Sequence, residues 1–228
     1  MPKKRNNKIH PTKQFYYRLV AIGLIIICST ILLNAFQARS ATLSVFSKLT
    51  GITGFSESGS LVKPSIKEDL LTPNQFSRPQ SKLKKVNAVV IHYVGNPGST
   101  AQANRDYFES LAESGERSAS SHFVVDTDGS IVQCIPLDEV SYASNNRNSD
   151  TISIEVCHPD ESGKFTNDTC DSLIELVAWL IDTYDLDKED IIRHYDVTGK
   201  VCPKYYVEHP DAWDKLKDDI WDYYEEHK

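Results

Sequence analysis

The chain has 228 residues, enough for one good-sized domain with appendages, and its net charge of −7 is unevenly distributed. The first 40 residues contain seven basic residues and no acidic one, so the remainder holds 18 basic and 32 acidic side chains, a net charge of −14. A body this acidic repels phosphate groups, and we therefore expect no nucleic-acid partner. The sequence has no internal repeat of fixed period, which argues against a solenoid or an array of binding modules.

An uncharged, largely apolar stretch at residues 19–36 is the first recognisable element. Its 18 residues reach the lower limit for a helix that spans a bilayer. The basic residues before it predict that residues 1–18 are cytoplasmic and that the bulk of the chain lies outside. A cleaved signal peptide is the competing interpretation, because Ala38-Arg39-Ser40-Ala41 resembles a small-residue processing site, and the domain would then be secreted.

Residues 37–84 are rich in Ser, Thr, Gly, Pro and Lys and show no sustained hydrophobic period. This composition predicts a flexible linker, whose r.m.s. reach as a coil would be about 40 Å. Such a reach is enough to hold a tethered domain away from a membrane. The folded domain is then expected at residues 85–228.

The predicted domain alternates strands and helices. A β-branched apolar run predicts a strand at residues 86–93, and Thr100 can cap a helix from 101 to about 114. Apolar residues at helical spacing predict two more helices, at 167–184 and 211–226. Further strands are predicted at 121–126, 130–135, 151–156 and 191–193, of which the first two form a hairpin. The pattern predicts an α/β fold with a central mixed β-sheet flanked by helices, preceded by the transmembrane helix.

Two histidines and one cysteine are candidate metal ligands. His92 ends the first strand, His194 follows the strand at 191–193, and Cys202 lies eight residues further on. Strand ends are a usual place for a site in an α/β sheet. Two imidazoles and a thiolate are a common zinc set that leaves one coordination position open. Taken singly, each residue is more often part of a core or a surface, and spacing alone does not prove that the three meet.

The remaining cysteines leave the disulfide state open. Cys28 lies in the apolar segment, whereas the other four would face an exterior in which disulfides are possible. If Cys202 binds a metal, at most one pair can form among the remaining three. Cys157 with Cys170 is one conceivable pair.

Four blocks of sequence occur in one order within residues 85–226. They are Val90-Ile91-His92-Tyr93, the hairpin Ser121-His122-Phe123-Val124-Val125-Asp126 with Asp128-Gly129-Ser130-Ile131-Val132-Gln133, then Ile152-Ser153-Ile154-Glu155, and finally His194-x5-Lys200-x-Cys202-Pro203. Together these blocks resemble the zinc-dependent N-acetylmuramoyl-L-alanine amidase family, the type 2 amidases and peptidoglycan-recognition proteins. The resemblance covers nearly the whole domain but neither the anchor nor the linker.

The resemblance implies a peptidoglycan amidase that uses Zn²⁺. It makes His92, His194 and Cys202 the zinc ligands. It makes Glu155 the carboxylate that takes a proton from the attacking water and Lys200 the cation that stabilises the oxyanion. These residue types suit those tasks, although Glu155 has an alternative interpretation as a solvent-facing strand position and Lys200 as a solvated side chain.

Four residues are predicted to line the substrate groove: Tyr93, His122, Tyr142 and His158. His122 is expected to be hydrogen-bonded within the sheet as a wall residue, because three ligands already suffice for a catalytic zinc. One stretch departs from the family pattern. Relatives often carry an aromatic-His-Ala-Gly run after the hairpin, where this chain reads Ser141-Tyr142-Ala143-Ser144-Asn145-Asn146.

The sequence thus predicts a monomeric, membrane-tethered zinc amidase outside the membrane that cuts the bond between N-acetylmuramic acid and L-alanine in peptidoglycan. The main alternative is a non-catalytic module that binds peptidoglycan or muropeptide, although such family members generally lack the cysteine ligand. Cytosolic recycling of muropeptides is opposed by the apolar segment. A purely structural wall anchor is opposed by the lack of wall-binding repeats.

Overall fold

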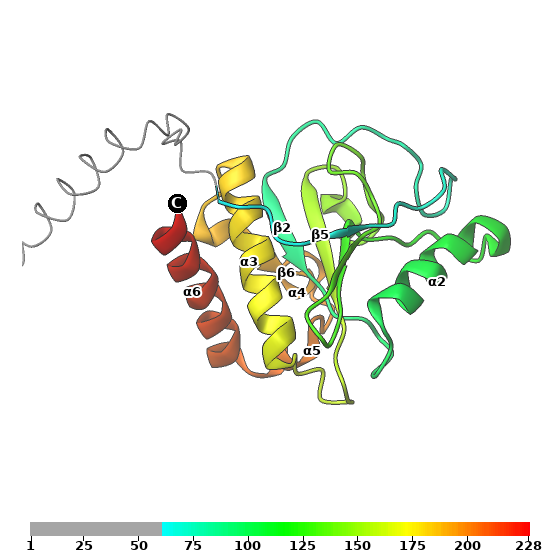
Figure 1. The fold of residues 1–228 in the computed structure, drawn as a ribbon. Helices are drawn as coiled ribbons and strands as arrows, with labels where there is room; N and C mark the ends of the chain where they lie inside the picture. The colour runs from blue at the N-terminus through cyan, green and yellow to red at the C-terminus, as the bar shows by residue number, and fades with distance from the viewer. Residues whose placement is uncertain (1–60) are drawn as a thin grey trace, which may run out of the picture. The chain divides into compact units, whose positions relative to one another are not determined.

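The computed structural model describes residues 61–228, whose fold is drawn in Figure 1. The predicted cytoplasmic segment (1–18), the predicted transmembrane helix (19–36) and residues 37–60 of the predicted linker lie outside the described residues. Within residues 61–228, no helix combines the length and the apolar character that crossing a membrane requires.

A six-stranded mixed sheet forms the centre of the described domain, as predicted. In spatial order its strands are β1 (Lys67–Glu68), β4 (Ile131–Gln133), β3 (Phe123–Val125), β5 (Thr151–Val156), β2 (Ala88–Ile91) and β6 (Ile191–Arg193). β3 and β4 form the predicted hairpin and pair antiparallel, whereas the other neighbouring pairs of this sheet are parallel. The carboxyl ends of β5, β2 and β6 therefore lie at the same edge.

The two predicted C-terminal helices lie side by side on one face of the sheet (Figure 1). They are α3 (Asn167–Tyr184) and α6 (Pro210–His227). Their apolar residues pack against every second strand residue, including Val89, Ile91 and Ile154, which are fully buried. Burying one such side chain stabilises the fold by roughly 1.5–3 kcal/mol, so this layer is the main hydrophobic core.

Helix α2 (Ala101–Ser114) covers the opposite face beside β3 and β4 (Figure 1). Thr100 caps it as predicted, because its hydroxyl oxygen accepts a hydrogen bond from the Ala103 N–H at 3.1 Å. Phe108 belongs to a second buried cluster with strand residues such as Val124. The two faces of the sheet thus have separate cores.

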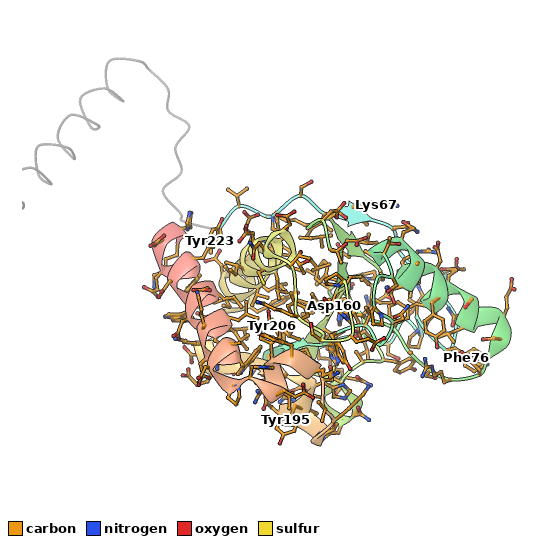
Figure 2. All side chains as sticks on the ribbon, turned by 90° about the horizontal axis from the view of Figure 1, so that it is seen from below. Lys67, Phe76, Asp160, Tyr195, Tyr206 and Tyr223 are labelled. Atoms are coloured by element: carbon orange, nitrogen blue, oxygen red, sulfur yellow. The ribbon has the colours of Figure 1, made fainter. Side chains whose placement is uncertain are left out.

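Four short helical elements were not predicted: η1 (Asn145–Arg147), η2 (Lys188–Asp190), α4 (His194–Thr198) and α5 (Lys204–Glu208). Each has five residues or fewer, too few to show a helical hydrophobic period. The tyrosines of α4 and α5 differ in burial: Tyr206 of α5 lies in the core, whereas Tyr195 of α4 is exposed (Figure 2).

The predicted linker is corrected by the structure, because residues 61–84 belong to the folded domain. This arm contributes β1, which pairs in parallel with β4, and Leu71, which is completely buried. The domain boundary expected at residue 85 therefore moves at least to residue 61.

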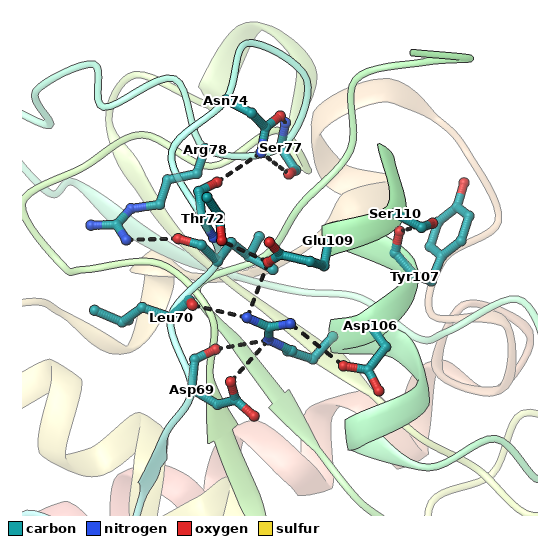
Figure 3. A network of polar contacts seen from close by, with 12 residues as sticks. Asp69, Leu70, Thr72, Asn74, Ser77, Arg78, Asp106, Tyr107, Glu109 and Ser110 are labelled. Carbon is teal, nitrogen blue, oxygen red and sulfur yellow. Dashed lines mark hydrogen bonds and ion pairs between the residues drawn. The ribbon is translucent and has the colours of Figure 1, made fainter. Parts of the chain in front are cut away.

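Two arginines hold the arm mainly by its backbone (Figure 3). Arg105 of α2 donates hydrogen bonds to the carbonyl oxygens of Asp69 and Leu70, at 3.1 and 2.9 Å. Arg78 donates to the Leu71 carbonyl at 2.7 Å and forms a two-bond ion pair with the buried carboxylate of Glu139. Hydrogen bonds to backbone carbonyls do not require apolar residues at regular spacing. Residues 61–84 therefore show no hydrophobic period, and their sequence resembles that of a linker.

The four cysteines of the described residues are free thiols. Cys157 lies in the cluster on the α2 face, whereas Cys170 packs against the core on the α3 and α6 face. The sheet separates the two side chains, so the conceivable Cys157–Cys170 disulfide is not formed.

Candidate metal centre and active site

The register of three parallel strands brings the candidate residues into one row. Ile91 of β2 is paired with Ile154 of β5 on one side and with Arg193 of β6 on the other. The next residues along the three strands are Glu155, His92 and His194. Because side chains alternate between the two faces of a sheet, these three point away from the α3 and α6 core. The backbone N–H of His92 donates to the Ile154 carbonyl at 2.9 Å, so pairing continues to the row itself.

The histidine ring atoms are close enough to share a metal ion. His92 Nδ1 lies 3.1 Å from His194 Nδ1 and 3.9 Å from Cys202 Sγ. The three potential ligand atoms lie within 4.8 Å of one another, and all three residues are buried. In a tetrahedral zinc site, two ligand nitrogens are about 3.3 Å apart and a nitrogen and a sulfur about 3.6 Å apart. The observed distances fit such a site.

Helix α4 and the loop after it position Cys202. The helix ends at Gly199, whose φ of +77° is in the left-handed region that favours glycine. The chain then turns back, and the Tyr195 N–H donates to the Cys202 carbonyl at 2.9 Å. At the start of α4, Arg193 and Asp196 form an ion pair at 2.8 Å that fixes the first turn, to which His194 belongs.

Burial sets the protonation of these ligands. It lowers the pKa of His92 well below its usual value, and repulsion from His194 when that ring is protonated, and from the Lys200 ammonium, acts in the same direction. Burial likewise lowers the pKa of His194. Both imidazoles are therefore neutral near pH 7, which is the form that binds a metal. Burial, with the charge of Glu155, raises the pKa of the Cys202 thiol to about 12, so a thiolate there requires a bound cation.

Glu155 is a carboxyl group suited to proton transfer. Its Oε2 is shielded from solvent and has no hydrogen-bond partner among the described residues. Burial raises the pKa of Glu155 to about 8, and the positive charge of Lys200 partly opposes this shift. A carboxyl group with a pKa near neutral can both accept and return a proton. Glu155 is partly exposed as a residue, but its shielded Oε2 does not face solvent.

Lys200 is exposed and follows Gly199 directly. Its charge acts on His92, His194 and Glu155, lowering the pKa of each, so the ammonium group lies near the row. Its Nζ makes no ion pair or hydrogen bond within residues 61–228. A cation without a protein partner beside a metal centre is available to a substrate.

The residues predicted to line the groove differ in their surroundings. Tyr93 and Tyr142 are partly exposed, so their rings can contact a ligand. His158 is buried beneath Tyr93, with ring centroids 5.1 Å apart, and its ring nitrogens lie 2.7 Å from the carbonyl oxygens of Val94 and Asp160. No ring nitrogen of His158 is left for a substrate.

His122 is also enclosed. Its side chain is completely buried, with Nδ1 3.1 Å from Ser153 Oγ and Nε2 3.0 Å from the Glu139 carbonyl oxygen. The expectation that His122 is hydrogen-bonded within the sheet is confirmed by its contact with Ser153 of β5. The same bonds leave it no nitrogen for a ligand, so it supports the wall of the site from behind.

Ser144 and Asn145 each contact one of the two histidine ligands, and the sequence did not predict either of them as a site residue. Ser144 Oγ lies 3.2 Å from His92 Nε2, and Asn145 Oδ1 lies 2.9 Å from His194 Nε2. The available signal was the departure of Ser141–Asn146 from the family pattern, which marked this loop as unusual without linking it to the metal ligands.

Comparisons with known proteins identify relatives of this arrangement. A family model described as N-acetylmuramoyl-L-alanine amidase matches residues 82–205, which include the whole row and Cys202. The N-acetylmuramoyl-L-alanine amidase CwlL of Bacillus licheniformis is 37% identical over an alignment of 147 residues that covers 59% of this chain and 40% of CwlL. The amidase BlyA of Bacillus subtilis (strain 168) is 34% identical over 155 residues, covering 59% of this chain and 41% of BlyA. The chain thus matches about 40% of the length of these curated relatives.

Solved structures share the fold. The catalytic domain of XlyA aligns with a TM-score of 0.59 at 23% identity, over 69% of this chain and 99% of that domain. The Staphylococcus aureus hydrolase AmiA, solved with its ligand, aligns with a TM-score of 0.52 at 21% identity, over 70% of this chain and 83% of AmiA. The family model covers more than half of the chain, and the resemblance seen in the four sequence blocks is confirmed. The chain belongs to the N-acetylmuramoyl-L-alanine amidase family.

Proposed function

We propose that this chain is a zinc-dependent amidase that hydrolyses the bond between N-acetylmuramic acid and L-alanine in peptidoglycan. The observation that carries the proposal is the buried convergence of His92, His194 and Cys202 beside Glu155, whose Oε2 has no hydrogen-bond partner among residues 61–228. Two neutral imidazoles and one thiol at these distances suit Zn²⁺, and three protein ligands leave a position open. The relatives CwlL and BlyA are named as N-acetylmuramoyl-L-alanine amidases.

The chain's own residues provide the rest of the chemistry. Zn²⁺, when bound, would polarise a carbonyl group and acidify water. Glu155 takes a proton as water adds to the amide carbon, and it returns that proton to the L-alanine nitrogen as the C–N bond breaks. Lys200 stabilises the negative charge that develops on the carbonyl oxygen. General acid–base catalysis of this kind contributes roughly 10²–10⁴-fold to a rate.

Mass spectrometry of products from defined muropeptides tests the proposal. We expect a free stem peptide with L-alanine at its N-terminus and an N-acetylmuramic acid product whose lactyl carboxyl group is free. Zinc analysis of the same protein is needed beside it. A protein that binds zinc and muropeptide but leaves the amide bond intact would be the non-catalytic module instead.

We also propose that residues 19–36 anchor the chain with its domain outside the cell membrane, as a monomer. The support is the uncharged apolar length of this segment and the basic residues before it. Membrane fractionation of the full chain, with protease added to intact cells, tests the anchor and its orientation. A shorter mature mass in the medium would show a cleaved signal peptide, and light scattering of solubilised protein gives the oligomeric state.

A further inference from the structure

We propose that Ser144 and Asn145 are positioning residues, which orient the two histidine ligands and fix the tautomer in which each can bind a metal. The inference rests on the proposed zinc site but concerns residues with no assigned role.

The geometry assigns one atom to each task. Both histidines direct Nδ1 toward the shared centre, where the two atoms lie 3.1 Å apart. The opposite nitrogen, Nε2, of His92 meets the Ser144 hydroxyl at 3.2 Å, and that of His194 meets the Asn145 carbonyl oxygen at 2.9 Å. The Asn145 carbonyl oxygen can only accept, so it keeps the proton of His194 on Nε2, and the lone pair of Nδ1 is then free for the metal. The Ser144 hydroxyl can accept in the same way from His92 Nε2–H when Nδ1 of that ring binds the metal.

The loop that carries these residues is itself held in place. Asn148 Oδ1 accepts hydrogen bonds from the backbone N–H groups of Ala143 and Ser144, at 3.1 and 2.6 Å. One step earlier, the Tyr142 N–H donates to the Ser120 hydroxyl at 3.0 Å, and the Ser120 N–H donates to the Tyr142 carbonyl at 3.1 Å. The backbone of Tyr142, Ala143 and Ser144, which leads into the two acceptors, is thus held by hydrogen bonds within the protein.

Burial predicts unequal contributions from the two contacts. Ser144 is 1% exposed, so without its hydroxyl the Nε2–H of His92 is enclosed and has no replacement partner. Asn145 is exposed, so water can partly replace its carbonyl oxygen. Loss of such an outer contact commonly weakens metal binding by about 10- to 100-fold. We expect Ser144→Ala at the upper end of that range and Asn145→Gly at the lower end.

The test measures metal binding rather than activity. Zinc dissociation constants are obtained by chelator competition, and the visible absorption of the Co²⁺-substituted protein reports ligand geometry. Asn145 has φ of +53°, so Asn145→Gly removes the side chain without backbone strain. Asn145→Asp keeps the accepting oxygen and serves as the rescue variant. Asn146→Ala is the matched control, because Asn146 is exposed and its side chain makes no hydrogen bond within residues 61–228.

We expect weaker zinc binding and altered Co²⁺ absorption in Ser144→Ala and Asn145→Gly, with values near wild type in Asn145→Asp and Asn146→Ala. The metal-free melting temperatures should stay close to wild type, since a general structural defect would lower them. The inference is overturned if Ser144→Ala and Asn145→Gly bind zinc within about threefold of wild type, or if Asn145→Asp is as weak as Asn145→Gly. Muropeptide cleavage is scored separately: wild-type protein that binds zinc without cleaving contradicts the proposed function, and the zinc constants still decide this inference.

Discussion

Replacing Glu155 with glutamine should remove activity and at the same time stabilise the metal-free protein. The two effects come from one feature, a carboxyl group whose Oε2 is shielded from water and has no partner among residues 61–228. Catalysis uses the proton that this group can carry. The fold, in contrast, is penalised whenever the group is ionised without a cation beside it.

The size of the stability effect follows from the pKa of Glu155, which burial raises from 4.5 to about 8. In the unfolded chain the group loses its proton near pH 4.5, whereas the folded protein keeps it until about pH 8. Stability is therefore fully present below pH 4.5 and falls as pH rises toward 8. At about 1.4 kcal/mol per pH unit, the loss at pH 7 is about 3 kcal/mol. Glu155→Gln stays neutral and avoids this loss, while its buried amide costs about as much as a buried neutral carboxyl group.

Urea denaturation of chelator-treated wild type and Glu155→Gln, between pH 4.5 and pH 8, checks the prediction. The difference in unfolding free energy should be near zero at the acidic end and should grow in favour of the variant as pH rises. Muropeptide turnover by the zinc-loaded variant should fall by roughly 10²–10⁴-fold. A stability difference that does not change with pH, or a variant with full activity, would refute the reasoning.

Three further outcomes follow from the structure. Zinc affinity should rise about tenfold per pH unit near neutrality, because binding releases the proton of Cys202, whose pKa burial raises to about 12; chelator competition across pH checks the slope. When free zinc is held at ~1,000 times its dissociation constant, removing it should lower the melting temperature by about 10 °C, as measured by calorimetry. An unchanged melting temperature would contradict a buried metal site. Arg78→Ala should cost about 3–5 kcal/mol in urea denaturation, because it leaves the buried Glu139 carboxylate without its cation, and a cost under about 0.5 kcal/mol would show that the arm does not depend on this pair.

Local sequence patterns predicted the regular elements well. Helix α2 begins and ends where the Thr100 cap and the apolar spacing placed it, and α3 carries its buried leucines at the expected helical positions. The residues 61–84 were misjudged for a physical reason. Their order depends on Arg105 of α2, which binds their backbone, and on Arg78 within the segment, which binds the Leu71 carbonyl and pairs with the distant Glu139. No local period records such contacts.

For the candidate site, too, the sequence predicted which residues take part but not which of them lie side by side. The sequence named His92 and His194 because each stands at a strand end, and Glu155 through the family resemblance. It could not give the order β5-β2-β6, which is long-range pairing. That order alone makes the three residues adjacent, since pairing of Ile91 with Ile154 and with Arg193 forces the next residue of each strand into one row. A shift of either pairing by one residue would turn Glu155 or His194 to the opposite face, toward the α3 and α6 core. The chemistry of the site therefore depends on strand register as much as on the residues themselves, and register is fixed here by the apolar residues that precede the row.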